Sequence, residues 1–448
     1  KGSVQLLDSG VQAQNMVLKL DDTALQGSLN YDSTAARPKI SFVLRSDNLD
    51  MNKFISAPLE SGSSSVSGSQ ASELKEGIAQ ANLPFDLDID VNIAKGRYGD
   101  YTVSGVTAKG GVSDSTVNIG TLSIKDFAGS AISAQGAIDN YRTLSGVDVT
   151  LSVDTDNIRK LGSVLAVDLS SMPTSLEALE ARIRLAGSVE NMDVTANIKA
   201  INGELIANGV VGNVLDAMTI SNLDLQVRHS NFNQALNSIQ PGMGAFDSLN
   251  KPLDFYARVS RSSGGYDLTD IKATVSGIQA TGNIGLDLSK DKPFMNGTLN
   301  LGDVVIGNKA AGGRNINASR SGGATNQNDR WSRETLDSKW MNAMNFDVSI
   351  MAKSINYEGW AMARPSLKVS LDSGKLDLDQ LQAGLYEGQL NLSGTLKPFN
   401  DGGGYTIDGN ANLRDVSLEP LVGSLTGNRI LQGQGAVNSD TQIGASGL

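Results

Sequence analysis

The chain has 448 residues and a net charge of −11, and it contains 49 Gly, 10 Pro, 5% aromatic residues and no Cys. The acidic balance, with 37 Lys and Arg against 48 Asp and Glu, argues against a nucleic-acid partner, because neutralising phosphates requires a positive surface. The absence of Cys excludes disulfides, thiolate metal sites and a cysteine nucleophile. The composition is typical of many short strands joined by tight turns.

Residues 1–55 are predicted to form a partial first β-repeat, which contains a short sequence cassette. In this cassette, apolar or small residues occupy every second position around a glycine, as in Leu25, Gly27 and Leu29. The alternation predicts a β-strand with these residues and the glycine on one face. A bare glycine there lets another backbone, a bend or a ligand come close. Residues 40–44 form the next predicted strand, and Asn48 is predicted to cap a short helix after it.

Residues 56–84 are predicted to form a Ser/Gly-rich insert that ends in a short helix. In the strand predicted after it, Asp86, Asp88 and Asp90 alternate with apolar residues. A calcium loop with aspartates at this spacing needs Gly at its sixth position and Glu at its twelfth, where this sequence has Val91 and Arg97. We therefore expect the aspartates to form the solvated face of a strand.

Residues 85–306 are predicted to hold the central β-repeats, with three further cassettes at residues 132–138, 205–211 and 278–284. The first two are each followed by a strand and then by a short helix, whose first turn Asn157 or Asn231 is predicted to cap. The pattern of residues 175–182, which follows a proline at position 173, predicts one further isolated helix.

Residues 307–345 are predicted to form a second flexible insert, rich in Gly, Asn and Ser, which again ends in a short helix. Residues 346–448 are predicted to form the last β-repeat, truncated at its end, with the fifth cassette at residues 390–396. Matching strands follow the two inserts, beginning at Phe85 and Phe346. This equivalence suggests a larger duplication superposed on the repeat.

The spacing of the cassettes indicates one repeat architecture. Successive glycines Gly136, Gly209 and Gly282 are 73 residues apart, whereas the flanking intervals, each of which contains an insert, are 109 and 112 residues. A fixed period is the mark of units that bury their apolar faces by stacking on their neighbours. We predict a mainly β fold, an elongated antiparallel sheet of roughly twenty strands with a few short capping helices, which has to curl, close or stack.

The last repeat has a pattern of strand residues at 346–350, 355–359, 376–396 and 413–416, with Trp331 and Leu336 ahead of them. This pattern resembles the AsmA family of bacterial envelope proteins. The resemblance covers essentially the whole chain, most sharply residues 331–435 and more loosely upstream. It implies a sheet curled into an open groove with an apolar floor, in a periplasmic protein anchored to the inner membrane. It also implies phospholipid transport between the inner and outer membranes and support of outer-membrane biogenesis. The partners implied are phospholipid acyl chains, outer-membrane components, and the inner membrane through an N-terminal anchor outside this chain.

The apolar positions of the cassettes are the candidate functional site. They recur at equivalent places and are Ile132, Ala134, Ile138, Leu205, Ala207, Val211, Ile278, Ala280, Ile284, Leu390, Leu392 and Leu396. One interpretation is the packed core of a sandwich, since a single buried face is what any antiparallel sheet shows. The other is the lipid-facing floor of a groove, which the family resemblance favours.

No constellation in the sequence predicts catalysis. The single histidine, His229, has no partnered nucleophile and no companion metal ligand, so we expect a surface or turn residue. Ser72 and Lys75 have the spacing of a penicillin-recognising motif, but the remaining motifs of those enzymes do not follow. We therefore expect no enzymatic activity, no cofactor and no metal.

Two other classes of function stay open from the sequence. A secreted β-solenoid or adhesin-type passenger shares the composition, but solenoid units repeat at about 20 to 30 residues, unlike the period of 73 residues found here. A structural scaffold without lipid transfer is the remaining alternative.

Overall fold

The computed structural model describes residues 2–20, 23–53, 83–164, 174–215, 218–239, 250–306, 339–342, 344–357, 360–398, 404–421 and 433–446, with residues 167, 169 and 172. The chain divides into two units, Lys1–Arg228 and His229–Leu448, and each is considered by itself. Most of both predicted inserts, including Ser72, Lys75, Trp331 and Leu336, lies outside the described residues.

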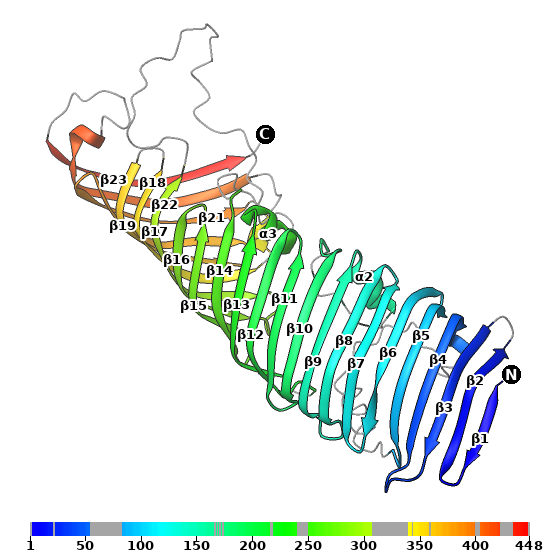
Figure 1. Cartoon of the computed structure of the whole chain (residues 1–448). Helices are drawn as coiled ribbons and strands as arrows, with labels where there is room; N and C mark the ends of the chain where they lie inside the picture. The colour runs from blue at the N-terminus through cyan, green and yellow to red at the C-terminus, as the bar shows by residue number, and fades with distance from the viewer. Residues whose placement is uncertain are drawn as a thin grey trace, which may run out of the picture. The chain divides into compact units, whose positions relative to one another are not determined.

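Unit 1 is an open sheet whose consecutive strands pair in chain order from β1 to β12 (Figure 1). Its strands are β1 (Ser3–Leu7), β2 (Gly10–Leu20), β3 (Thr23–Asp32), β4 (Lys39–Asp50), β5 (Asp86–Tyr98), β6 (Tyr101–Ser113), β7 (Thr116–Phe127), β8 (Ser130–Asn140), β9 (Ser145–Thr155), β10 (Leu179–Ser188), β11 (Met192–Ala200), β12 (Gly203–Gly212) and β13 (Thr219–His229). The backbone of β13 lies against Gly209 of β12, next to Asn222.

Unit 2 repeats this plan, with consecutive strands paired in chain order from β14 to β23. Its strands are β14 (Leu253–Arg261), β15 (Gly265–Val275), β16 (Ile278–Asp287), β17 (Phe294–Ile306), β18 (Asn345–Tyr357), β19 (Trp360–Asp372), β20 (Lys375–Leu385), β21 (Gly388–Pro398), β22 (Gly404–Ser417) and β23 (Gln434–Ser446). The predicted fold class, mainly β with an open sheet and a few short helices, is confirmed.

Among the strand pairs described, each unit has one parallel pair and the others are antiparallel, and each parallel pair falls where an insert was predicted. Strands β4 and β5 pair in parallel, as do β17 and β18. A hairpin cannot join parallel strands, because the chain has to return along the strand before the next one begins. For β4, with 12 residues, that return spans about 40 Å. The two long connections therefore occupy equivalent places in the two units, as the matching strands after them predicted.

The parallel step also explains the two longer cassette intervals. In unit 1 the cassettes lie in β3, β8 and β12, and in unit 2 they lie in β16 and β21. The chain reverses its direction between antiparallel neighbours, so after four such changes, as from β8 to β12, a strand runs in its original direction. The chain keeps its direction between parallel neighbours. The segments from β3 to β8 and from β16 to β21 each contain one parallel pair, so they need five strand-to-strand connections to return to the original direction. Within each unit, all cassettes therefore run in the same direction.

The cassette glycines mark close approaches between neighbouring backbones. A Cβ atom added to Gly136 would overlap the carbonyl oxygen of Asp148 in β9, and one added to Gly282 would overlap that of Thr298 in β17. The same contact, with the backbone oxygen of the following strand, occurs at Gly27, Gly209 and Gly394. Of the three roles left open by the sequence, the close approach of another backbone is the one the structure shows.

Short helices follow the strand after a cassette strand. They are η1 (Met51–Lys53) after β4, α2 (Ile158–Val164) after β9, α3 (Phe232–Ile239) after β13 and a turn of helix at 418–421 after β22. The side-chain oxygen of Asn157 accepts a hydrogen bond from the N–H of Lys160 at 2.9 Å, and Asn231 caps α3 through Gln234 at 3.0 Å. Both predicted caps are therefore confirmed. A further short helix, η3 (Lys339–Asn342), precedes β18.

One predicted cap and one predicted helix were wrong. Asn48 lies inside β4, which continues to Asp50, and the side chain of Asp50 instead accepts a hydrogen bond from the N–H of Asn52. The helix predicted at residues 175–182 does not form, because β10 begins at Leu179 and pairs with both β9 and β11. Pairing on both sides outweighs the weak helical preference of a short Leu/Glu/Ala segment.

Candidate functional site

The register of unit 1 gathers apolar side chains into rows that cross the sheet on one face. A row is a set of directly opposite residues on successive strands. The row through Ala134 runs from β2 to β12 and consists of Met16, Gly27, Leu44, Val91, Ala108, Leu122, Ala134, Leu151, Ile183, Ala196 and Ala207. Every member is apolar or glycine, so an apolar surface without charged side chains continues across eleven strands.

A second row, through Ile138, runs from β1 to β12. Its members are Leu6, Val11, Tyr31, Ile40, Leu87, Val112, Val117, Ile138, Val147, Gly187, Met192 and Val211. Two separate cassettes, in β8 and β12, thus contribute Ile138 and Val211 to one row, and Ala134 and Ala207 to the other. The spacing of 73 residues places equivalent residues on the same face, four strands apart.

Unit 2 has an apolar face of the same kind. The row through Leu392 consists of Ile271, Gly282, Leu299, Ile350, Leu367, Leu381, Leu392 and Ala411. A parallel row joins Leu286, Met295, Phe346, Leu371, Leu376, Leu396 and Ile407. Ala280 and Ile284 lie in neighbouring rows of this face, opposite Leu301 and Gly297, and Ile278 begins β16 opposite Val275.

The burial of the candidate residues is incomplete. Ala134, Ala207 and Val211 are buried, whereas the other nine sequence-predicted positions are half-buried. Several larger side chains of the rows are open to solvent, among them Leu122, which is 39% exposed, and Ile407, which is 42% exposed. Within each unit, the described residues provide a single sheet and no second sheet packed on its apolar face. The apolar faces are therefore less covered than the core of a sandwich.

Two of the twelve candidates are partly covered by the protein's own helices. Ile132 packs against a cluster of buried residues that includes Phe127 of β7 with Leu161 and Val164 of α2. In unit 2, Leu390 packs on a second cluster at the 418–421 helix. The side chain at the first cassette position is therefore packed like an ordinary core residue at one edge of the sheet. Sequence periodicity missed this difference, although the capped helices predicted after the strands were a signal for it.

The opposite face of the sheet is polar and contains several ion pairs. Asp90 pairs with Arg45 at 2.9 Å and with Lys109 at 3.4 Å, and Lys39 pairs with Asp88 at 2.6 Å. The hydrogen bond from Arg45 is the main reason that the pKa of Asp90 lies below its usual value. The structure thus places these carboxylates among cations on a strand face, as predicted, and the described residues contain no group of three or more side chains suited to hold a metal.

Asp86 has its own partner on this face, Arg37, at 2.9 Å. The hydrogen bond from Arg37 is the first cause of its lowered pKa, followed by bonds from the backbone of Asp114 and the hydroxyl of Ser113. Ion pairs therefore join the parallel pair β4/β5 from Arg37, just ahead of β4, to Arg45.

His229, predicted to be a surface or turn residue, is neither. It ends β13 with 8% of its surface exposed, and its Nδ1 accepts a hydrogen bond from the N–H of Asn231 at 3.0 Å. This contact shapes the junction that leads into α3, and it gives the ring a structural role there.

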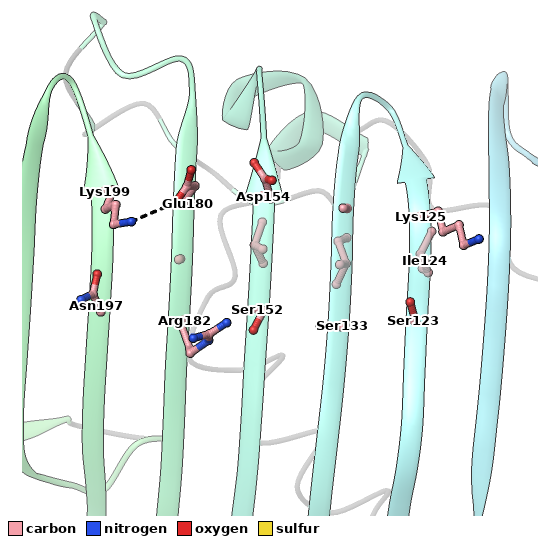
Figure 2. A pocket seen from close by; sticks show the side chains of 14 residues that line it. Ser123, Ile124, Lys125, Ser133, Ser152, Asp154, Glu180, Arg182, Asn197 and Lys199 are labelled. Atoms are coloured by element: carbon pink, nitrogen blue, oxygen red, sulfur yellow. Dashed lines mark hydrogen bonds and ion pairs between the residues drawn. The ribbon is translucent and has the colours of Figure 1, made fainter.

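The polar face of unit 1 carries a hollow of about 700 Å³ over strands β7 to β11. Figure 2 shows its labelled side chains, which come from five adjacent strands. One row across it consists of Ser123, Ser133, Ser152, Arg182 and Asn197. The next row places Asp154 opposite Glu180 and Glu180 opposite Lys199. Sequence analysis missed this hollow, which depends on cross-strand register.

The fold and the apolar rows define a class of protein. In this class, each unit is a single-layer repeat sheet with one apolar face. The comparison with family models matches residues 287–448 to the AsmA family, and this confirms the resemblance over those residues. Comparisons with curated proteins and with solved structures returned no match. Among the described residues, no helix has both the length and the hydropathy needed to cross a membrane.

Proposed function

We propose that the apolar faces of the two units bind phospholipid acyl chains and support lipid transport between the inner and outer membranes and outer-membrane biogenesis. The observation that carries the proposal is the set of uncharged apolar rows, most of whose larger members remain half-buried or exposed. The match of residues 287–448 to the AsmA family supports it. The function proposed is binding and transfer, without enzymatic activity.

The energetic reason for such a face is the cost of carrying a lipid through water. Each buried CH₂ group contributes about 0.8 kcal/mol, so a chain of sixteen carbons in water costs on the order of 13 kcal/mol. Contact with a continuous apolar row removes much of this cost. Because neighbouring positions of the rows are chemically alike, a bound chain meets similar contacts at each step and is not held in one deep minimum.

The length of the face fits transfer better than a single closed site. The row through Ile138 crosses twelve strands, and at ~4.8 Å per interval it extends over roughly 50 Å. One leaflet of a bilayer core is roughly 15 Å thick, so the row is about three acyl chains long. A lipid that binds at one end of unit 1 has to move along the face to leave at the other.

The proposed setting is the bacterial periplasm, with anchoring to the inner membrane. The proposed partners are phospholipids, the inner membrane and outer-membrane components. The family resemblance supports this setting, and the absence of Cys is compatible with an oxidising compartment.

The experiment that tests the proposal is mass spectrometry of lipids that co-purify with the chain, compared between two variants. Leu122→Asp places a carboxylate in the row through Ala134, where an acyl chain would have to cover it at a cost of several kcal/mol. Thr121→Asp is the matched control, because Thr121 is exposed on the opposite face and lies across from Lys109.

We expect phospholipid in the wild-type chain and in Thr121→Asp, and a loss of about tenfold or more in Leu122→Asp. Circular dichroism checks that both variants keep the β-sheet, which is expected because both sites are exposed. A wild-type chain that carries no lipid, or a folded Leu122→Asp variant that carries as much as the control, would contradict the proposal and favour a structural scaffold.

A further inference from the structure

The polar hollow of unit 1 contains an unpaired arginine, Arg182. Arg182 is exposed and makes no hydrogen bond or ion pair within the described part of the chain. Two residues further along the same strand and on the same face, Arg184 behaves differently. It donates two hydrogen bonds to the carboxylate of Asp148, both at 3.0 Å. The contrast singles out Arg182 as a guanidinium free to bind an external anion.

The neighbours of Arg182 are hydrogen-bond donors. Directly opposite it on β9 lies Ser152, and the row continues through Ser133 and Ser123. Figure 2 shows the guanidinium of Arg182 extending toward the β9 side, where Ser152 projects from its strand. A guanidinium fork beside a line of hydroxyl groups suits an oxyanion with several acceptor oxygens, such as a phosphate group.

The adjacent row carries negative charge that is not fully compensated. Asp154 lies directly opposite Glu180, an arrangement of like charges that destabilises a sheet unless a cation covers it. Lys199 reaches Glu180 at 3.4 Å, as the dashed line in Figure 2 shows. Asp154 has no ion pair or hydrogen bond to its side chain within the described residues. The row therefore retains one uncompensated carboxylate, next to the row that retains one uncompensated guanidinium.

The fifth charged residue that lines the hollow, Lys125, points elsewhere. The side chain of Lys125 lies over Gly105 of β6, and in Figure 2 its ammonium group points away from the other labelled side chains. The charges that face the hollow are then Arg182 and Lys199 against Asp154 and Glu180, which balance. A ligand that carries both a cation and an anion is better matched to this surface than one that carries charge of a single sign.

From these contacts we infer that the hollow binds a small zwitterion with a primary ammonium group and a phosphate group. The phosphate lies on Arg182 and the serine row, and the ammonium group lies on Asp154 and Glu180. The two rows are two residues apart along each strand, which is about 6.6 Å, so the two groups are a few bonds apart, as in phosphoethanolamine. The hollow lies on the face opposite the apolar rows, so this inference is independent of the proposed lipid-binding function.

The test is calorimetric titration of the full chain with O-phosphoethanolamine, inorganic phosphate and ethanolamine. We expect O-phosphoethanolamine to bind about tenfold or more tightly than either single-charge probe. Arg182→Ala should weaken the binding of both phosphate-containing probes by about tenfold. Asp154→Asn should weaken the binding of O-phosphoethanolamine and leave that of phosphate unchanged or stronger.

Two control variants remove the same charges from the neighbouring pair. Arg184→Ala and Asp148→Asn lie on the same two strands and the same face, and they should leave all three affinities within about twofold. The inference is wrong if no probe gives a saturable signal, if phosphate alone binds as tightly as O-phosphoethanolamine, or if Arg184→Ala weakens binding as much as Arg182→Ala.

The same chemistry could come from a free metabolite or from a lipid headgroup, and a second arm separates these sources. Vesicles of phosphatidylethanolamine are compared with vesicles of phosphatidylcholine, whose quaternary ammonium group has no N–H to donate. Sedimentation of the chain with the first vesicles alone, abolished by Arg182→Ala, identifies a headgroup site. Binding of free O-phosphoethanolamine without vesicle binding identifies a soluble ligand, and both results support the inferred chemistry.

Discussion

The close approach at the cassette glycines predicts a large cost for adding a single methyl group. Gly282 has φ +157°, and its added Cβ would overlap the carbonyl oxygen of Thr298 in β17. Forcing an extra methyl into a packed site costs about 1 to 3 kcal/mol, and a strained backbone conformation costs about 1 to 3 kcal/mol more. The loss of unfolded-state entropy returns only about 0.4 to 1 kcal/mol. Gly282→Ala should therefore lower the free energy of unfolding by about 1 to 5 kcal/mol.

Gly302 offers a control on the neighbouring strand. Its added Cβ would meet nothing closer than Gln279, at 3.7 Å, which is ordinary van der Waals contact. Gly302→Ala should leave stability unchanged or raise it by about 0.4 to 1 kcal/mol. Urea unfolding followed by tryptophan fluorescence reports on this unit, because all three tryptophans of the chain lie in it. Equal unfolding free energies for the two variants would refute the close-approach reasoning.

Three further predictions address the site, a helix cap and an ion pair. Ile278→Asp places a carboxylate on the apolar face of unit 2 and should reduce co-purifying phospholipid as measured by mass spectrometry; undiminished lipid in the folded variant would remove that cassette from the path. Asn157→Ala removes the cap of α2 and should lower the unfolding free energy by about 1 kcal/mol, and a change below about 0.3 kcal/mol in urea titrations would speak against a stabilising cap. The pKa of Asp90 is lowered by Arg45, so its stabilising effect is present above the unfolded pKa of about 3.9 and is lost as pH falls through the folded pKa. Asp90→Asn should therefore destabilise the chain at pH 7, and the gap to wild type should close below about pH 4; a gap that stays constant with pH in urea titrations would contradict the assignment.

Strand alternation allowed much of the fold to be predicted from sequence. The period-two pattern around Gly136 and Gly209 placed both cassettes on one face, because successive side chains of a strand point to opposite sides. The caps Asn157 and Asn231 were also predictable, since capping is a local interaction. The helix predicted at 175–182 failed because strand pairing on both sides is a tertiary effect that a short window does not contain.

The sequence was sufficient to predict which residues lie on the apolar face, but not how they are arranged across the strands. Alternation identified the apolar positions, but the rows depend on register, and register is fixed by pairing between segments far apart in the sequence. For this reason the parallel pairs at the inserts, the partial cover of Ile132 by α2 and the polar hollow around Arg182 all escaped sequence analysis. The serines at 123, 133 and 152 are unremarkable on three separate strands and become a row only when the strands pair.

The most direct test of the account is site-specific photo-crosslinking of the chain to lipid inside cells. A photoreactive amino acid replaces Leu122 or Ile407, the exposed apolar residues of the two faces, and in parallel replaces Thr121 or Thr406, their immediate neighbours on the polar face. The account predicts crosslinks to phospholipid at Leu122 and Ile407 and none at the two threonines. Crosslinks of equal yield on both faces, or none at either apolar position, would contradict it.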